Sequence, residues 1–241
     1  MRRRLRVLLV LMLLAALALV AAALYRRYFP GGDGASQSNV LIREYLLYPE
    51  KRPAMTNAAL ERCAGAPFVL PSAGLIGLMY GDTAGPYSPA RRHTGIDIFG
   101  DGDSGTVPIY AVYDGYLTRL PEWRSSVILR HDDPLQPGRV IWTYYTHMAS
   151  RDGSVSYIAP QFPPGTSEQF VAQGSLLGYQ GDFAGSGAPV AMHLHLSVVL
   201  SGPDGLFLNE AVLANTLDPS PYFGLPLTLE SEPQPRPVRC R

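Results

Sequence analysis

Two histidines separated by one residue are the first group in this sequence that could carry chemistry. His193 and His195 lie in the run MHLHLSVVL, whose aliphatic and β-branched residues predict a strand. Residues i and i+2 of a strand point to the same face, so both imidazoles would face one side. That arrangement suits one metal ligand beside one group that contacts the metal's water, although two histidines on a solvated face would share the pattern.

The sequence HTGID supplies a second group, His93 and Asp97. A helix would bring an i, i+4 pair to one face, but Gly95 and the isoleucines around it disfavour helix. On a straight strand the two residues would lie about 13 Å apart, which is too far to share one ion. We therefore expect a bend, which Gly95 permits. An ordinary aspartate at a turn is the alternative.

His147 completes the set at the end of the aromatic-rich run IWTYYTHM. Alone, it would be read as a histidine at the end of a strand near solvent. Taken together, four histidines and one aspartate, with two compact spacings among them, favour a zinc site. Three nitrogen or oxygen ligands with an open fourth position are typical of catalytic zinc, and hydrolysis is the chemistry that such a centre most directly supports.

The order and spacing of these groups resemble the M23 zinc endopeptidases of the lysostaphin and LytM type. The resemblance covers roughly residues 68–200 and includes HTGIDIFG, GTVPIYAVYDGYL, VILRHDD, YYTHM, VAQGSLLGYQGDFAGSG and HLHLSV. It implies a mainly β fold (an antiparallel sandwich or open barrel), a Zn²⁺ cofactor and the peptide part of bacterial peptidoglycan as substrate. Several short β-rich segments separated by Gly and Pro turns predict the same fold class.

The resemblance also implies a role for each member of the set. His93, Asp97 and His195 would bind zinc, and His147 with His193 would form a catalytic pair beside the metal. One of the pair would act as general base, while the other would orient water or stabilise the transition state. The sequence does not assign which is which.

A tyrosine shortly before the first zinc ligand is a further feature of that family. Tyr87, six residues before His93, is the candidate to stabilise the oxyanion, and Tyr80 is the alternative. An aromatic that merely packs against a turn would explain Tyr87 equally well. The fifth histidine, His131, is expected either to be structural or to support the site residues from behind.

The flanking segments predict how the domain is built into the chain. Residues 63–225 would form the peptidase-like domain, and residues 226–241 a Pro-rich tail, extended and unpacked apart from Cys240. Residues 28–62 would be a linker with two short helices, expected over 39–49 and 54–63.

The first 27 residues predict a signal anchor or a signal peptide. Residues 7–25 contain no charge, and as a helix they would be roughly 28 Å long, close to the hydrocarbon thickness of a bilayer. Four arginines precede this run and two follow it, so the N-terminus is expected in the cytoplasm and the body outside, as a single-pass membrane protein. The alternative is cleavage, which would give a secreted or periplasmic protein.

The two cysteines are expected to pair in that oxidising location. Cys63 and Cys240 bracket the predicted domain, and closing so long a loop would stabilise the fold by about 5 kcal/mol in the chain-entropy model. Two free thiols are the alternative.

Charge and site composition limit the remaining function classes. Residues 1–27 carry six arginines and no acidic residue, so the rest of the chain is net acidic and nucleic-acid binding is disfavoured. A non-catalytic module of the same type, which activates another cell-wall hydrolase, is the alternative to an enzyme. Such a module is expected to have lost site residues, and all five positions are present here.

Overall fold

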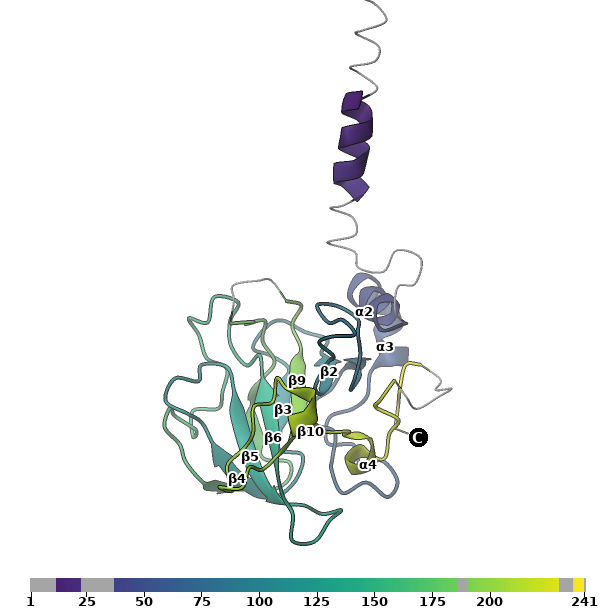
Figure 1. The fold of residues 1–241 in the computed structure, drawn as a ribbon. Coiled ribbons are helices and arrows are strands. Elements are labelled where there is room, and N and C mark those ends of the chain that lie inside the picture. Colours follow the sequence, from purple (N-terminus) through teal and green to yellow (C-terminus); the bar gives the residue numbers. More distant parts are fainter. Residues whose placement is uncertain (1–11, 23–36, 186–189, 230–235, 241) are drawn as a thin grey trace, which may run out of the picture.

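The protein is described by a computed structural model that covers residues 12–22, 37–185, 190–229 and 236–240 (Figure 1). Within these residues the fold is mainly β, with every pairing between named strands antiparallel. The predicted fold class is confirmed at this level. Short helices lie at the edges of the sheet.

One large sheet and one small sheet make up the strands of the described residues. In chain order the strands are β1 (Leu75–Leu78), β2 (Ile96–Phe99), β3 (Pro108–Tyr110), β4 (Gly115–Thr118), β5 (Val127–Asp132), β6 (Val140–Thr146), β7 (Gln169–Val171), β8 (Leu176–Tyr179), β9 (Leu194–Leu200) and β10 (Thr216–Leu217). The large sheet has the order β1-β2-β9-β6-β5-β4-β7, with β10 on β9, and β3 pairs with β8.

The alternation of side chains along β9 decides which face is core and which face can carry chemistry. Leu194, Leu196 and Val198 enter the main hydrophobic core. The intervening residues, His195 and Ser197, point to the other face because successive strand residues alternate. Strand β2 follows the same rule, with its isoleucines in the core and Asp97 opposite them. The polar residues of the two strands therefore share one face.

Two helices, α2 and α3, precede the first strand in the chain and lie beside the β1–β2 edge of the sheet (Figure 1). The helical elements are α2 (Gln37–Leu47), η1 (Pro49–Lys51), α3 (Arg52–Met55), η2 (Leu213–Asn215) and α4 (Ser220–Phe223). The first predicted helix is confirmed with a shift of two residues. The helix predicted over 54–63 is wrong, because Thr56 is extended and Asn57 exchanges backbone hydrogen bonds with Gly74. The helix that does form here, α3, begins at Arg52, has Pro53 in its first turn and ends at Met55.

Helix α2 is packed onto the domain. Its buried residues, Ser38, Leu41 and Tyr45, recur at helical spacing and form one face. Leu41 and Tyr45 join a cluster with Met55 and with residues of β1 and β2. The described part of the predicted linker is thus attached to the same sheet as the predicted site.

The predicted membrane segment, residues 7–25, is described only in part. Residues 12–22 form a helix with exposed side chains, and the rest of the segment lies outside the described residues. Among the helices that the structure describes, none has both the length and the apolar character needed to cross a bilayer. The membrane anchor remains a prediction.

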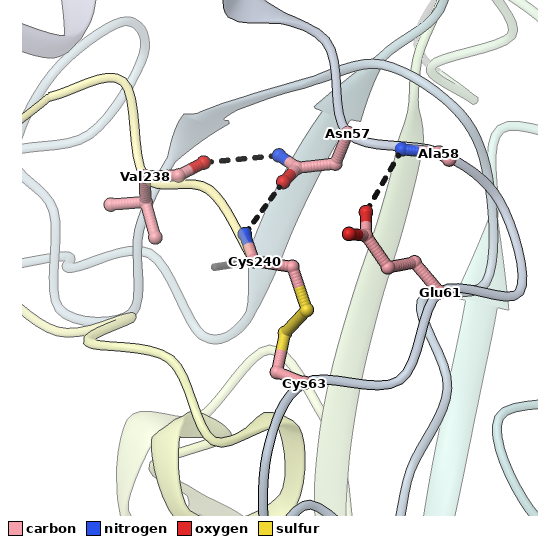
Figure 2. Close-up of a disulfide and its surroundings, with 6 residues drawn as sticks. All are labelled: Asn57, Ala58, Glu61, Cys63, Val238 and Cys240. Carbon is pink, nitrogen blue, oxygen red and sulfur yellow. Dashed lines mark hydrogen bonds between the residues drawn. A yellow bond between two sulfur atoms is a disulfide. The ribbon is translucent and has the colours of Figure 1, made fainter.

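The Cys63–Cys240 disulfide is present, as the sequence predicts (Figure 2). It joins cysteines 177 residues apart in the sequence. Asn57 reinforces the connection, because its Nδ2 donates to the Val238 carbonyl at 3.0 Å and its Oδ1 accepts from the Cys240 N–H at 3.1 Å. The bond therefore ties the segment that follows α3 to the end of the described chain.

The C-terminal tail is packed, so the expectation of an unpacked tail is wrong for its described residues. Leu227 and Val238 lie in the main core. The Arg236 guanidinium donates to the Ser38 hydroxyl at 3.1 Å and to the Gly77 carbonyl at 3.1 Å. The tail thus crosses back to α2 and β1. Its apolar residues pack into a core formed by distant segments, which a local sequence pattern does not predict.

His131 is a core residue held in a chain of hydrogen bonds. Its Nδ1 donates to the Asp114 carbonyl at 2.7 Å, and its Nε2 accepts from the Thr143 hydroxyl at 2.7 Å. The Tyr145 hydroxyl lies 3.3 Å from that of Thr143 and accepts the Val112 N–H at 3.0 Å. Burial lowers the pKa of His131 to about 4, so the ring is neutral in the folded state.

This depressed pKa predicts acid sensitivity. Between pH 6.5 and pH 4 the unfolded state binds a proton that folded His131 does not, so stability falls as pH falls through this window and is retained above it. The full contribution is roughly 3 kcal/mol. We expect urea unfolding of the full chain to show a steeper loss of free energy between pH 7 and pH 4 than unfolding of His131→Gln. Parallel pH curves would contradict the assignment.

Candidate metal centre

The register between β2 and β9 creates the centre. Asp97 and His195 are paired residues of these antiparallel strands, so their side chains project from the same face next to each other. Asp97 Oδ1 lies 2.9 Å from His195 Nδ1. Both residues are almost fully buried, at 3% and 5% exposure.

His93 reaches the same point from the loop before β2. Its Nε2 lies 3.0 Å from Asp97 Oδ1 and 2.9 Å from His195 Nδ1, and the ring is fully buried. The structure thus brings together the three residues that the sequence predicts as ligands, each offering one ligand atom.

Hydrogen bonds on the far side of each ring fix which nitrogen faces the triangle. His93 Nδ1 donates to the Met79 carbonyl at 2.9 Å, which leaves the lone pair on Nε2. His195 Nε2 lies 2.8 Å from the Ser197 hydroxyl, which can accept a hydrogen bond from it; in that tautomer the lone pair lies on Nδ1. Two nitrogen lone pairs and a carboxylate oxygen then converge at about 3 Å, an arrangement that requires a proton or a metal cation between them.

The charges at the triangle also favour a proton or a metal cation between the three ligand atoms. Burial alone would raise the pKa of Asp97, but His93 and His193 outweigh it and hold that pKa well below its usual range. Burial alone would lower the pKa of His93, but Asp97 raises it. An ionised carboxylate and two oriented imidazoles, each with a partner on its outer side, match the ligand set of a catalytic zinc site.

Gly95 is needed at this centre for a different reason from the predicted bend. A Cβ at this position would lie 2.1 Å from the Leu196 carbonyl oxygen and 2.7 Å from the Ser197 hydroxyl. Only glycine therefore lets the chain before β2 approach β9 this closely. His93 meets Asp97 because it precedes β2, which begins at Ile96, and not because a strand is kinked.

The second pair of histidines lies beside the triangle. The rings of His147 and His193 are 4.3 Å apart, and His193 Nε2 lies 3.6 Å from Asp97 Oδ2. His147 Nδ1 donates to the Phe183 carbonyl and His193 Nδ1 donates to the Ala191 carbonyl, both at 2.7 Å. Each ring therefore keeps an unprotonated Nε2, which can accept a proton.

Both of these imidazoles are neutral in their surroundings. Burial, assisted by the nearby His193, lowers the pKa of His147 to about 3, and burial lowers the pKa of His193. Since the rings touch, a proton on one disfavours a proton on the other. His147 also adopts a left-handed backbone conformation, with φ of 72°, which is uncommon for a residue other than glycine and is often found at functional sites.

A cleft of about 360 Å³ reaches the centre at His195 and the second pair at His147. Its walls include His147, His195, Tyr87, Arg91 and Glu210, together with residues of β6. None of the described residues 37–62 lines it. The N-terminal helices therefore leave this opening uncovered within the described part of the chain.

Tyr87 is the predicted tyrosine that the structure places at the cleft. The centre of its ring lies 4.7 Å from that of the His93 ring. The Arg91 guanidinium lies over the Tyr87 ring, 5.9 Å from the ring centre. Burial and then the charge of Asp97 raise the Tyr87 pKa, so its hydroxyl stays protonated and can donate. Tyr80 instead donates to the Thr216 carbonyl at 3.2 Å and does not line the cleft.

Two residues that support the site are not predicted from the sequence. Ser197 continues the alternation of His193 and His195 by two more residues, a signal that was available in HLHLS but carries no chemistry by itself. Phe99 stacks on His193, with ring centres 5.0 Å apart and planes at 21°. That contact depends on the pairing of β2 with β9, which no local pattern gives.

Comparisons with known proteins find similarity at the level of solved structures. No family model matches this sequence, and no curated protein matches it. The antimicrobial peptidase lysostaphin from Staphylococcus simulans matches at a TM-score of 0.39 and 20% identity, over 67% of this chain and 56% of lysostaphin. A catalytic-domain mutant of the prophage-encoded M23 protein EnpA from Enterococcus faecalis matches at a TM-score of 0.35 and 24% identity, over 64% of this chain and 96% of that domain.

These matches carry no conclusion about activity at such identities and TM-scores. The chain also spans little more than half the length of lysostaphin. The chemistry has to be inferred from the side chains of the centre.

Proposed function

We propose that this protein is a zinc-dependent endopeptidase that cleaves peptide cross-links of bacterial peptidoglycan outside the cytoplasm. The observation that carries the proposal is the buried triangle of His93, Asp97 and His195, with its lone pairs directed inward. The triangle reaches the cleft through His195 and lies beside two neutral histidines that can exchange protons.

Each site residue has a role that follows from its protonation state. Zn²⁺ held by the triangle would supply Lewis acidity, which activates water and polarises a carbonyl group. His147 and His193 each present an unprotonated Nε2, so one can take a proton from the attacking water and return it to the leaving amine. Because the two rings disfavour double protonation, the other stays neutral and orients its partners.

Tyr87 completes the proposed machinery. Tyr87 lines the cleft and its ring lies next to His93, so its protonated hydroxyl is the proposed hydrogen-bond donor to the oxyanion that develops during hydrolysis. Such donors contribute most where water is excluded.

The substrate and the location rest on the sequence. The six segments that resemble M23 endopeptidases support a peptidoglycan peptide as substrate. The uncharged run at residues 7–25 and its arginine bias support anchoring in the cell membrane with the domain outside, or export followed by cleavage. The disulfide fits either oxidising location.

Metal removal tests the proposal directly. We expect the full chain, purified in mild detergent, to hold about one zinc ion and to cleave peptidoglycan cross-links, which exposes new amino groups. A chelator should abolish hydrolysis and added Zn²⁺ should restore it, whereas His195→Ala should neither hold zinc nor hydrolyse. Absence of zinc from the native chain would overturn the proposal. Zinc without hydrolysis of either glycine-bridged or directly cross-linked walls would instead favour a non-catalytic activator.

A further inference from the structure

We infer that Phe99 is a positioning residue for His193, and that helix α2 holds Phe99 in place. The inference rests on the proposed function, because it concerns one of the two histidines beside the metal centre. It assigns a role in catalysis to a segment that precedes the predicted peptidase domain.

The first step is the contact between Phe99 and His193. Phe99 is the last residue of β2 and lies two residues after Asp97, so both project toward the site face of the sheet. Its ring lies nearly parallel to the imidazole of His193, with centres 5.0 Å apart and planes at 21°. Phe99 is 5% exposed and His193 is 7% exposed, so the contact is shielded from solvent.

The second step concerns what fixes the orientation of the His193 ring. One edge is fixed by donation from Nδ1 to the Ala191 carbonyl, and the His147 ring contacts it at 4.3 Å. A single hydrogen bond lets an imidazole pivot about that bond. The stacked Phe99 ring opposes this rotation, and it thereby keeps Nε2 directed toward Asp97 and the centre. A displacement of about 1 Å at a reacting group can reduce a rate about 100-fold.

The third step is the support behind Phe99. The ring belongs to the apolar cluster of Leu41, Tyr45, Met55 and Leu75, and Ile42 packs against this cluster. Leu75 of β1 is the strand partner of Phe99, so the ring lies where α2 covers the edge of the sheet.

Gly77 shows how closely this support is fitted. A Cβ at Gly77 would lie 2.6 Å from Cγ1 of Ile42 and 2.7 Å from the Phe99 ring. Ile42 of α2 and Phe99 therefore meet over a position of β1 that has no side chain. The helix also contacts the other side of the centre, where Ser38 donates to Asp82, whose carbonyl accepts the His93 N–H at 2.9 Å.

A kinetic comparison in the zinc-loaded full chain tests the inference. We expect Phe99→Leu to lower kcat about 10–100-fold on a soluble peptidoglycan peptide, with KM and zinc content unchanged. Ile42→Ala should lower kcat in the same direction by a smaller factor. Leu46→Ala removes the same number of carbons from the exposed side of α2 and should have no effect. Unchanged kcat in folded Phe99→Leu, or a loss confined to KM, would overturn the inference.

A double-mutant cycle separates positioning of His193 from a general structural effect. In a His193→Ala background, Phe99→Leu should cause no further loss of kcat, because the group that it positions is gone. Fully additive losses would overturn the inference.

A nuclear magnetic resonance measurement keeps the inference independent of activity. The stacked Phe99 ring should shift the His193 ring-proton resonances upfield, and Phe99→Leu should remove that shift while Leu46→Ala leaves it in place. Absence of a change in Phe99→Leu would overturn the contact. If the wild-type chain shows the shift but hydrolyses no peptide, the proposed function is contradicted, whereas the contact between Phe99 and His193 is confirmed.

Discussion

Replacing Asp97 by asparagine is expected to remove zinc from the centre and to reduce peptidoglycan hydrolysis to the uncatalysed background. Asp97 supplies the only formal negative charge of the triangle, and its Oδ1 lies within 3.0 Å of both ligand nitrogens. Asparagine has nearly the same shape, but it is neutral and offers an amide N–H to the imidazole lone pairs. Asparagine therefore disfavours a bound cation, and in the metal-free site its amide can donate hydrogen bonds to the imidazole nitrogens.

The measurement combines metal analysis, hydrolysis and unfolding. Zinc content should fall from about one ion per chain to near zero, as expected when a catalytic ligand is lost. The free energy of unfolding of the metal-free protein should not decrease, because the new amide can donate to the facing nitrogens. Asp103→Asn makes the same chemical change at an exposed position and should leave zinc and activity intact. Stoichiometric zinc in Asp97→Asn would contradict the ligand assignment.

Replacing His147 by alanine is expected to lower the hydrolytic rate by about 10²–10⁴-fold while zinc is retained. His147 does not belong to the triangle of ligand atoms, yet it presents an unprotonated Nε2 beside His193 at the cleft. Its removal takes away a proton acceptor and leaves the ion's three ligands in place. The measurement is kcat on a peptidoglycan peptide together with zinc content.

The backbone of His147 calls for a second variant. Alanine in a left-handed conformation is strained, so His147→Ala could lose activity through a shifted loop. Asparagine tolerates that conformation and also lacks the imidazole, and His147→Asn should show a similar loss with better retained stability. Full activity in either zinc-loaded variant would contradict the proposed role.

Much of the centre could be predicted from the sequence because its ligands lie in short, regular segments. The alternation of a strand places His193 and His195 on one face without knowledge of the fold. The pairing of Asp97 with His195, by contrast, is set by the register of two strands almost a hundred residues apart. Resemblance to a family implied that pairing, whereas spacing alone left it open.

The errors have a common physical cause, which is tertiary structure that overrides a local pattern. The segment 54–63 has a helical composition, but Asn57 pairs with Gly74 and with the tail instead. Residues 226–241 look unpacked because proline-rich sequences show no periodicity, yet Val238 finds the main core. Phe99 looks like one more strand residue until α2 and His193 are placed on either side of it.

The disulfide has a consequence for how the protein would survive proteases. All six residues of the proposed machinery lie between Cys63 and Cys240, so a single cut of the backbone between these cysteines would release no fragment. Both pieces would stay joined through the sulfur atoms, with the sheet and core still available to hold them together. A nicked molecule would therefore keep its proposed ligands on one covalent unit, which would be an advantage wherever the protein meets proteases.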